Sequence, residues 1–361
     1  MMTAKRYLAY GLRKSLVRTV VLCAIAVIIG VMSADSSTSH QNPRLNSTGI
    51  ETLAIMLGAL ATIIPMLELA DFKNRRNLDT LYFFPIGRKA MAAVHFISGF
   101  VQVATIYTAA SVASGLYLLA KTDIFALEYL IPYYFLSLAL GLVIYSVICF
   151  IYDRANTVTD GVIICILWVF VIWLVASIAR ESIIKPFWGP DVWTTSYIEK
   201  WNESSYLAEW GILYAPLNNL TVIYQDLLEI NGNGKYYADI YLEHSYLFYV
   251  WGAIGIAAAW GFICGFGIRG ANMAGEPSSS WLGYKMLIPV YGYTTILYFA
   301  SLASDISLIV MLFVAMLIGY VVYRRGFKLK RSDIIVMACG IIAALMGAWL
   351  GSMMPTYFYG F

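Results

Sequence analysis

Charged residues are scarce in this sequence. Asp, Glu, Lys and Arg together make up 12% of the 361 residues, whereas hydrophobic residues make up 60%. Soluble globular domains contain about 45–50% apolar and about 25% charged residues. Apolar runs of about 18 or more residues recur along the chain, and each is long enough to cross a hydrocarbon core of about 30 Å. The composition excludes an ordinary soluble domain and predicts a polytopic membrane protein.

The sequence also lacks the short motifs that mark many enzymes. It contains no G-x-x-x-x-G-K-[ST] phosphate-binding loop, no HExxH and no CxxC. The three histidines, His40, His95 and His244, are too scattered to predict a metal site. All five cysteines fall inside apolar runs, where they are typical of small buried hydrophobic residues. We therefore expect no catalytic residue, no metal and no cofactor in this chain, which is predicted not to be an enzyme by itself.

The apolar runs predict about nine transmembrane spans. The alternation of a membrane β-barrel is absent, so the spans are expected to be helices. The predicted fold class is therefore all-α and polytopic. The spans are placed at 19–33, 50–70, 91–120, 129–151, 160–179, 245–268, 286–304, 306–323 and 333–353.

The same runs divide the chain into regions. Residues 1–18 are basic and amphipathic, and they precede the first span either as a basic flank that fixes its orientation or as a cytoplasmic interfacial helix. Residues 19–179 hold the first five spans, and residues 245–361 hold the remaining ones. Between them, residues 180–244 are rich in aromatic side chains and predict one or two short amphipathic helices, broken before Pro216. We expect this external segment to form a helical cap between spans five and six.

Clusters of basic residues predict the orientation. Short cytoplasmic loops carry an excess of Lys and Arg. Residues 5–18, 71–90 and 324–331 hold five basic residues each, whereas the loops at 34–49 and 121–128 hold few. Placing the three basic clusters on one side puts the N-terminus in the cytoplasm and, with nine spans, the C-terminus outside.

Ionisable side chains are nearly absent from the interiors of the predicted spans. Glu68 falls at the cytoplasmic end of the second span, and His95 and Gln102 lie on the third. His95 is more typical of an interface histidine than of a proton relay, and Gln102 is expected to bond to a neighbouring helix. Ion-coupled carriers use buried carboxylates or unwound helices near the middle of the membrane. Their scarcity disfavours such a carrier.

One cytoplasmic stretch, "ELADFKNRRNLDTLYFFPIGRKAM" at residues 68–91, combines charges, aromatic residues and a proline. It predicts a short helix at 72–86 that Pro85 ends, with Gly87 turning the chain toward the third span. A basic loop that binds lipid headgroups would need only the charges. A helix that docks on another protein and transmits motion would also need aromatic side chains to fill a pocket on the partner. It would need charges to orient it and a rigid connection to its span.

Three stretches of the chain resemble the permease subunits of type-2 ABC exporters of Gram-positive bacteria. "RNLDTLYFFPIGR" is similar to the pattern K…D-x-Y-x-S-L-P-I-S-R that follows the second span in these permeases, with Phe83–Phe84 in place of Ser-Leu and Gly87 in place of Ser. "CFIYDRANTVTDGVIICILW" resembles the loop between their fourth and fifth spans. "NMAGEPSSSWLGYKMLIP" resembles a loop after their sixth span. The resemblance covers most of residues 1–270.

The resemblance implies a membrane-spanning permease of an ATP-driven exporter. The helix at 72–86 would be a coupling helix that docks on a separate ABC ATP-binding subunit, and ATP and magnesium would belong to that subunit. A second permease, identical or homologous, would complete the pathway in the bacterial cell membrane, and no nucleic acid is expected as a partner. Apolar spans suit an amphipathic or apolar cargo, such as a peptide, a lipid-like molecule or a drug. The coupling residues would be Arg76, Asp79, Tyr82, Phe83, Pro85 and Arg88.

Two other classes of function stay open. An ion-coupled or facilitative carrier would transport its substrate even when ATP is depleted. A non-transporting membrane sensor or immunity protein would bind its ligand through residues 180–244 and would function without an ATPase partner.

Overall fold

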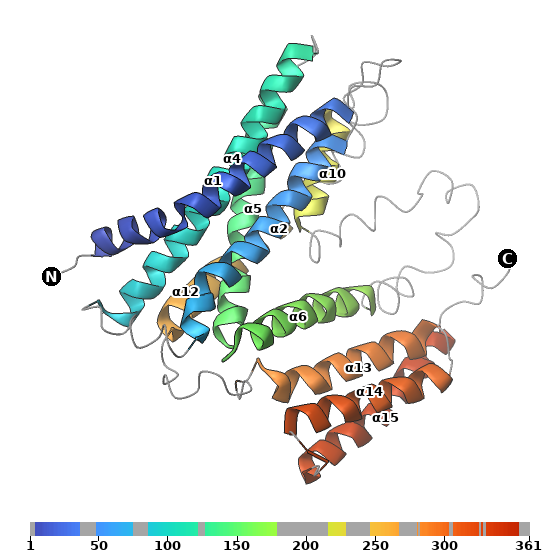
Figure 1. Ribbon diagram of the computed structural model, residues 1–361. Helices are drawn as coiled ribbons and strands as arrows, with labels where there is room; N and C mark the ends of the chain where they lie inside the picture. Colours follow the sequence, from blue (N-terminus) through green and yellow to red (C-terminus); the bar gives the residue numbers. More distant parts are fainter. Residues whose placement is uncertain are drawn as a thin grey trace, which may run out of the picture. The chain divides into compact units, whose positions relative to one another are not determined.

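The described part of the chain, in the computed structural model, is built from helices (Figure 1). Every element assigned in the described residues is a helix. The chain divides into two units, one formed by Met1–Asp153 with Gly211–Gly275 and the other by Arg154–Trp210 with Glu276–Phe361. The structure describes residues 4–36, 48–74, 86–121, 127–178, 216–228, 246–266, 280, 282–302, 306–324, 326–327 and 330–353.

The first unit is a bundle of long helices. Its elements are α1 (Ala4–Ser36), α2 (Thr48–Leu69), the 3-10 helix η1 (Ala70–Lys73), α4 (Arg88–Lys121), α5 (Leu127–Asp153), α10 (Pro216–Leu228) and α12 (Leu247–Gly265). Helix α1 packs along α4, and α5 packs against both α2 and α12 (Figure 1). Large, fully buried side chains fill the core between these helices. They include Leu57, Ile106, Tyr107, Tyr145 and Phe262.

The outer faces of this bundle are apolar. Val17 on α1 is 72% exposed, and Ile256 and Trp260 on α12 are 75% and 71% exposed. Soluble monomers rarely expose large contiguous apolar patches. Hydrophobic residues on the outside of a helix bundle are the arrangement that a lipid environment favours.

Six helices of the described residues are long and apolar enough to cross a membrane. They are Ala4–Ala34, Gly49–Lys73, Arg88–Ala120, Leu130–Asp153, Val158–Val175 and Phe248–Gly265. An all-helical chain with several such helices agrees with the predicted fold class. The number nine for the spans is not established by these six helices and stays a prediction.

Helix α1 runs without a break through residue 18, where the sequence places the boundary between an interfacial helix and the first span. Residues 4–36 contain no proline, and Gly11 and Gly30 face neighbouring atoms of the bundle. Ser15 donates to the Leu12 carbonyl at 3.2 Å, and Thr19 donates to the Ser15 carbonyl at 3.0 Å. Bonds of this kind can bend a helix slightly, but α1 continues through both residues.

Helix α10 is the described part of the predicted external segment. It packs between α2 and α5. A Cβ atom on Gly58 would lie 3.7 Å from Leu217, and Tyr133 on α5 lies 3.2 Å from the Thr221 hydroxyl on α10. The rest of the predicted cap, residues 180–215 and 229–244, lies outside the described residues. The cap therefore stays a prediction.

The second unit is built around α13 (Tyr284–Leu302). This helix packs against α6 (Val158–Ile178), α14 (Ile306–Arg324) and α15 (Arg331–Met353). Thr157 begins α6, since its hydroxyl accepts a hydrogen bond from the Asp160 backbone N–H at 3.0 Å, as an N-cap residue does. Helices α13, α14 and α15 lie at the positions of the last three predicted spans.

Candidate functional site

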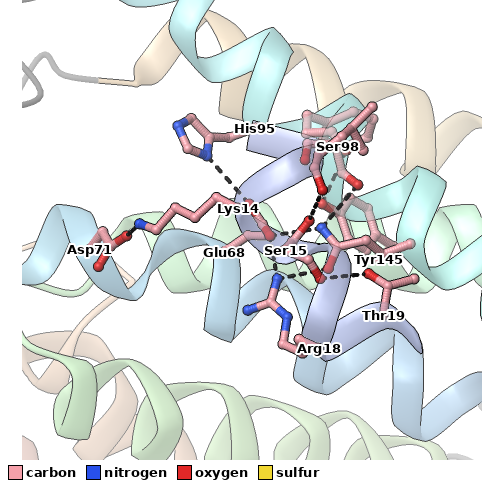
Figure 2. A network of polar contacts seen from close by, with 12 residues as sticks. Lys14, Ser15, Arg18, Thr19, Glu68, Asp71, His95, Ser98 and Tyr145 are labelled. Carbon is pink, nitrogen blue, oxygen red and sulfur yellow. Dashed lines mark hydrogen bonds and ion pairs between the residues drawn. The ribbon is translucent and has the colours of Figure 1, made fainter. Parts of the chain in front are cut away.

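The most polar part of the first unit lies where α1, α2 and α4 meet. Arg18 on α1 donates through Nη2 to Glu68 Oε1 on α2. Gln102 on α4 donates to the same carboxylate oxygen at 2.8 Å and accepts from Arg18 Nη2 at 2.7 Å. Figure 2 shows Arg18 and Glu68 among the side chains of this network. A single carboxylate thus joins three helices.

The second oxygen of Glu68 faces a histidine. His95 Nδ1 on α4 lies 3.5 Å from Glu68 Oε2, and His95 Nε2 lies 3.0 Å from the Tyr7 hydroxyl on α1. A carboxylate only accepts hydrogen bonds, so a neutral His95 ring is suited to carry its proton on Nδ1. With that tautomer the Tyr7 hydroxyl is the donor to Nε2, and with the other tautomer it is the acceptor. The chain from Tyr7 through His95 to Glu68 continues the polar network toward the beginning of α1.

The two ion pairs of this network differ in exposure. Lys14 Nζ lies 2.6 Å from Asp71 Oδ2, with side chains that are 62% and 37% exposed. Arg18 and Glu68 are only 31% and 10% exposed. Exposed pairs contribute about 0–1 kcal/mol to stability, whereas removing one partner of a buried pair leaves a costly unpaired charge. Breaking the Arg18–Glu68 pair is therefore expected to cost more stability than breaking the Lys14–Asp71 pair.

A cavity of about 130 Å³ lies beside this network. Since a water molecule in the liquid occupies about 30 Å³, the cavity has room for about four. Ser98, which is 1% exposed, lines the cavity, and its hydroxyl has no hydrogen-bond partner among the described residues. The same holds for Arg18 Nε. The surface of the cavity is mostly apolar with a few polar atoms, and its size suits water or a very small molecule. The lining residues are Tyr7, Tyr10, Gly11, Lys14, Ser15, Arg18, Leu67, Glu68, Asp71, Val94, His95 and Ser98.

Most of the predicted coupling residues lie outside the described part of the chain, which resumes at Ile86 after residue 74. Arg88 is described: it is exposed at the beginning of α4. The helix predicted at 72–86 does not begin at Phe72, because residues 70–73 form the 3-10 helix η1 and Asn74 is extended. A coupling helix within residues 75–85 stays a prediction. The residues outside the described ranges are Arg76, Asp79, Tyr82, Phe83 and Pro85.

The segment that leads into the predicted coupling helix is firmly held. Phe72 is 8% exposed, and its ring meets His95 edge to face at 4.8 Å and Phe266 at 4.9 Å. Lys73 Nζ donates to the Asp153 carbonyl at 3.0 Å and lies 5.4 Å from the centre of the Tyr152 ring. These contacts tie the chain just before residue 75 to α4, α5 and α12.

In the second unit, two of the stretches that carry the family resemblance come together. Tyr284, at the beginning of α13, donates to Asp160 Oδ1 on α6 at 2.9 Å. About two turns further along α6, Trp168 donates to the Leu282 carbonyl at 2.9 Å. A hydrogen bond between Asp160 and Tyr284 thus joins the "TDG" of one stretch to the "GYK" of the other.

Replacing Tyr284 by phenylalanine is expected to destabilise the second unit by about 1–3 kcal/mol. The change removes the hydrogen bond to Asp160, whose other oxygen is buried without a partner in the described residues, so the carboxylate would lose its stabilising donor. The measurement is the apparent unfolding temperature in detergent. Tyr291→Phe on the same helix is the matched control, since the Tyr291 hydroxyl bonds to none of the described residues. Equal effects of the two changes would contradict this account.

Sequence reasoning found part of this site. Gln102 does bond to neighbouring helices, as predicted, whereas the position of His95 at the membrane interface stays a prediction. Arg18 was missed as a partner of Glu68, because a basic residue before an apolar run is typical of any cytoplasmic flank. The signal that could have found the pair is the isolation of Glu68, the only acidic residue between Glu51 and Asp71.

The described residues offer no site for a metal, because no three His, Cys, Asp or Glu side chains among them lie close enough to hold an ion. No protein-family model matches the sequence, and no curated protein or solved structure is significantly similar to it.

Proposed function

We propose that the chain is the membrane-spanning permease of an ATP-driven exporter of the type-2 ABC class. It would cross the bacterial cell membrane with nine spans and with its N-terminus in the cytoplasm. A separate subunit would bind ATP and magnesium and hydrolyse the nucleotide. A second permease, identical or homologous, would complete a pathway for an amphipathic or apolar cargo.

The observation that supports this proposal best is the attachment of the two ends of the predicted coupling segment. Before it, Phe72 and Lys73 are fixed to the bundle by ring contacts and a hydrogen bond. After it, the chain enters α4 directly at Arg88. A lever transmits motion only when its ends are stiffly joined to the moving part. A force on residues 75–85 would therefore act on α2 and α4, which flank the polar network.

A specific observation also favours a second candidate, a proton-coupled carrier. Glu68, His95 and Arg18 form a cluster of ionisable groups on helices that can span a membrane. Such residues are costly in a membrane and often mark proton paths. Glu68, however, lies at the end of α2, next to Leu69, whereas the sites of secondary carriers lie near the middle of the membrane.

Charge reversal in the predicted coupling segment tests the exporter proposal. Asp79→Lys and Arg88→Glu are each expected to lower ATP hydrolysis by the purified complex at least about tenfold, which corresponds to about 1.4 kcal/mol of coupling. Membrane insertion should be unchanged, because both residues belong to a predicted cytoplasmic loop. Hydrolysis is measured on complexes isolated in mild detergent and reconstituted with lipid.

Arg331→Glu is the matched control, since Arg331 is an exposed basic residue of another predicted cytoplasmic loop. It should leave hydrolysis within about twofold of the original chain. Unchanged hydrolysis in the Asp79 and Arg88 variants would remove the assignment of these residues. A chain that isolates without any ATPase, and whose transport survives ATP depletion, would favour the carrier instead.

A further inference from the structure

Two helices of the first unit are too long for a membrane. Helix α1 has 33 residues and α4 has 34, so each is about 50 Å long. The hydrocarbon core of a bilayer is about 30 Å thick. Tilting alone would have to exceed about 50°, whereas helices in membranes tilt by about 0–40°. One end of each helix must therefore stand outside the hydrocarbon.

The polar network marks where the hydrocarbon ends. Charged groups avoid the membrane interior, so Arg18 and Glu68 belong at its boundary. From this level to the opposite helix ends there are about 19 residues in α1, 21 in α2 and 20 in α4, counted from Arg18, Glu68 and Gln102. These lengths correspond to about 28–32 Å. Three helices thus give the same thickness, and it matches a bilayer.

The parts of α1 and α4 beyond this level form a projection of their own. Residues 4–17 and 88–101 each extend about 21 Å from it. The two segments run side by side, since Tyr7 bonds to His95 and Gly11 faces Ser98. Tyr7 is 3% exposed and Met91 is 1% exposed, so the projection has a packed protein core. It does not depend on lipid to cover these residues.

The end of the projection is basic. Lys5, Arg6, Arg88 and Lys89 are all exposed, and residues 4–17 and 88–101 contain no Asp or Glu. The headgroup layer is only about 5–8 Å thick on each side of the hydrocarbon. Arg13 and Lys14 lie within that layer, but these four residues lie about 18–21 Å from the boundary. Lipid headgroups are too far away to be their partners.

We propose that Lys5, Arg6, Arg88 and Lys89, the basic tip, bind an acidic surface of a protein partner in the aqueous phase. The tip adjoins the predicted coupling segment, since Arg88 follows it after two residues. The partner is therefore the ATP-hydrolysing subunit, and to this extent the inference rests on the proposed function. Complementary charges steer association and fix the orientation of the bound partner.

The first test is retention of the ATPase by a charge-reversed tip. Lys5→Glu, Arg6→Glu and Lys89→Glu are combined in the full chain, and the complex is isolated in mild detergent at low salt. We expect at least tenfold less ATPase to be retained. Arg13→Glu is compared with Lys89→Glu as a matched single reversal at the headgroup level, and it should change retention less than twofold.

Each outcome of this test has a separate meaning. An original chain that isolates without an ATPase contradicts the proposed function. Full retention by the triple variant contradicts the basic tip while leaving the proposed function intact. Equal losses from Arg13→Glu and Lys89→Glu also contradict the tip, because the effect would then depend on charge alone and not on position.

The second test measures the depth of the tip without an activity assay. A membrane-impermeant maleimide is added to inside-out vesicles that hold Lys89→Cys or Val112→Cys, and the original chain gives the background of its own cysteines. Lys89→Cys should react rapidly and become at least tenfold slower when the ATPase is bound. Val112→Cys, on an exposed apolar face of α4, should stay unlabelled. Slow labelling of Lys89→Cys without the partner would overturn the placement of the tip in water.

Discussion

Replacing Glu68 by alanine is expected to lower the free energy of unfolding by about 3 kcal/mol, the lower end of the range for breaking a buried ion pair. The change would leave Arg18 without its counter-charge and Gln102 without an acceptor. It would also remove the carboxylate that faces His95. Arg18 retains 31% of its exposure and can be partly hydrated, which is why the upper end of the range is not expected.

The measurement is unfolding in mixed micelles by titration with SDS. Arg18→Met combined with Glu68→Met is the matched variant, since apolar residues in place of both partners leave no unpaired charge. This double variant should recover most of the stability lost in Glu68→Ala. If the double variant is as unstable as the single one, the loss comes from packing and not from the unpaired arginine.

Replacing Gly30 by alanine is expected to lower the free energy of unfolding by about 1–3 kcal/mol, as overpacking of a close contact does. A Cβ atom at this position would lie 2.8 Å from the Ala110 carbonyl oxygen of α4. That oxygen is backbone and cannot rotate away, so α1 and α4 would have to separate. The apparent unfolding temperature in detergent measures the effect.

Gly252→Ala on α12 is the matched control for Gly30→Ala. A Cβ atom on Gly252 would meet no atom within 4 Å. Alanine favours a helix over glycine by about 0.8–1 kcal/mol, so this change should be neutral or stabilising. The two substitutions are chemically identical, and their effects should differ in sign. The same sign for both would mean that contact with Ala110 does not decide the result.

The positions of the helices could be predicted from the sequence because long apolar runs leave few alternatives. The helices Leu247–Gly265 and Arg331–Met353 lie close to the predicted 245–268 and 333–353. The extent of α1 and α4 was harder to predict. In α4 the apolar run begins at residue 91, so composition alone puts the membrane boundary there, whereas Gln102 lies in the polar network. Hydrophobic character does not tell a lipid-facing turn from one packed on protein.

The polar network could be predicted only in part. Glu68, His95 and Gln102 stand out as polar residues in apolar surroundings, but their meeting depends on the register of three helices. That register is set by close contacts such as the one at Gly99, where a Cβ atom would overlap the Tyr145 hydroxyl and lie 3.1 Å from Glu68. A single sequence shows that glycine is present, not which helix it approaches. The pairing of Asp160 with Tyr284 has the same origin, since the two residues are far apart in the chain.

The position of α10 between α2 and α5 has a consequence for biogenesis. The ribosome completes α2 and α5 well before it reaches residue 216, so both helices enter the membrane while their partner is still unmade. The site on α2 and α5 beside Gly58 and Tyr133 must meanwhile hold water, lipid or another helix. Synthesis of α10 then displaces this temporary occupant. Assembly of the bundle therefore ends with the late docking of α10. A chain released before Leu228 would leave the α10-binding surfaces of α2 and α5 uncovered.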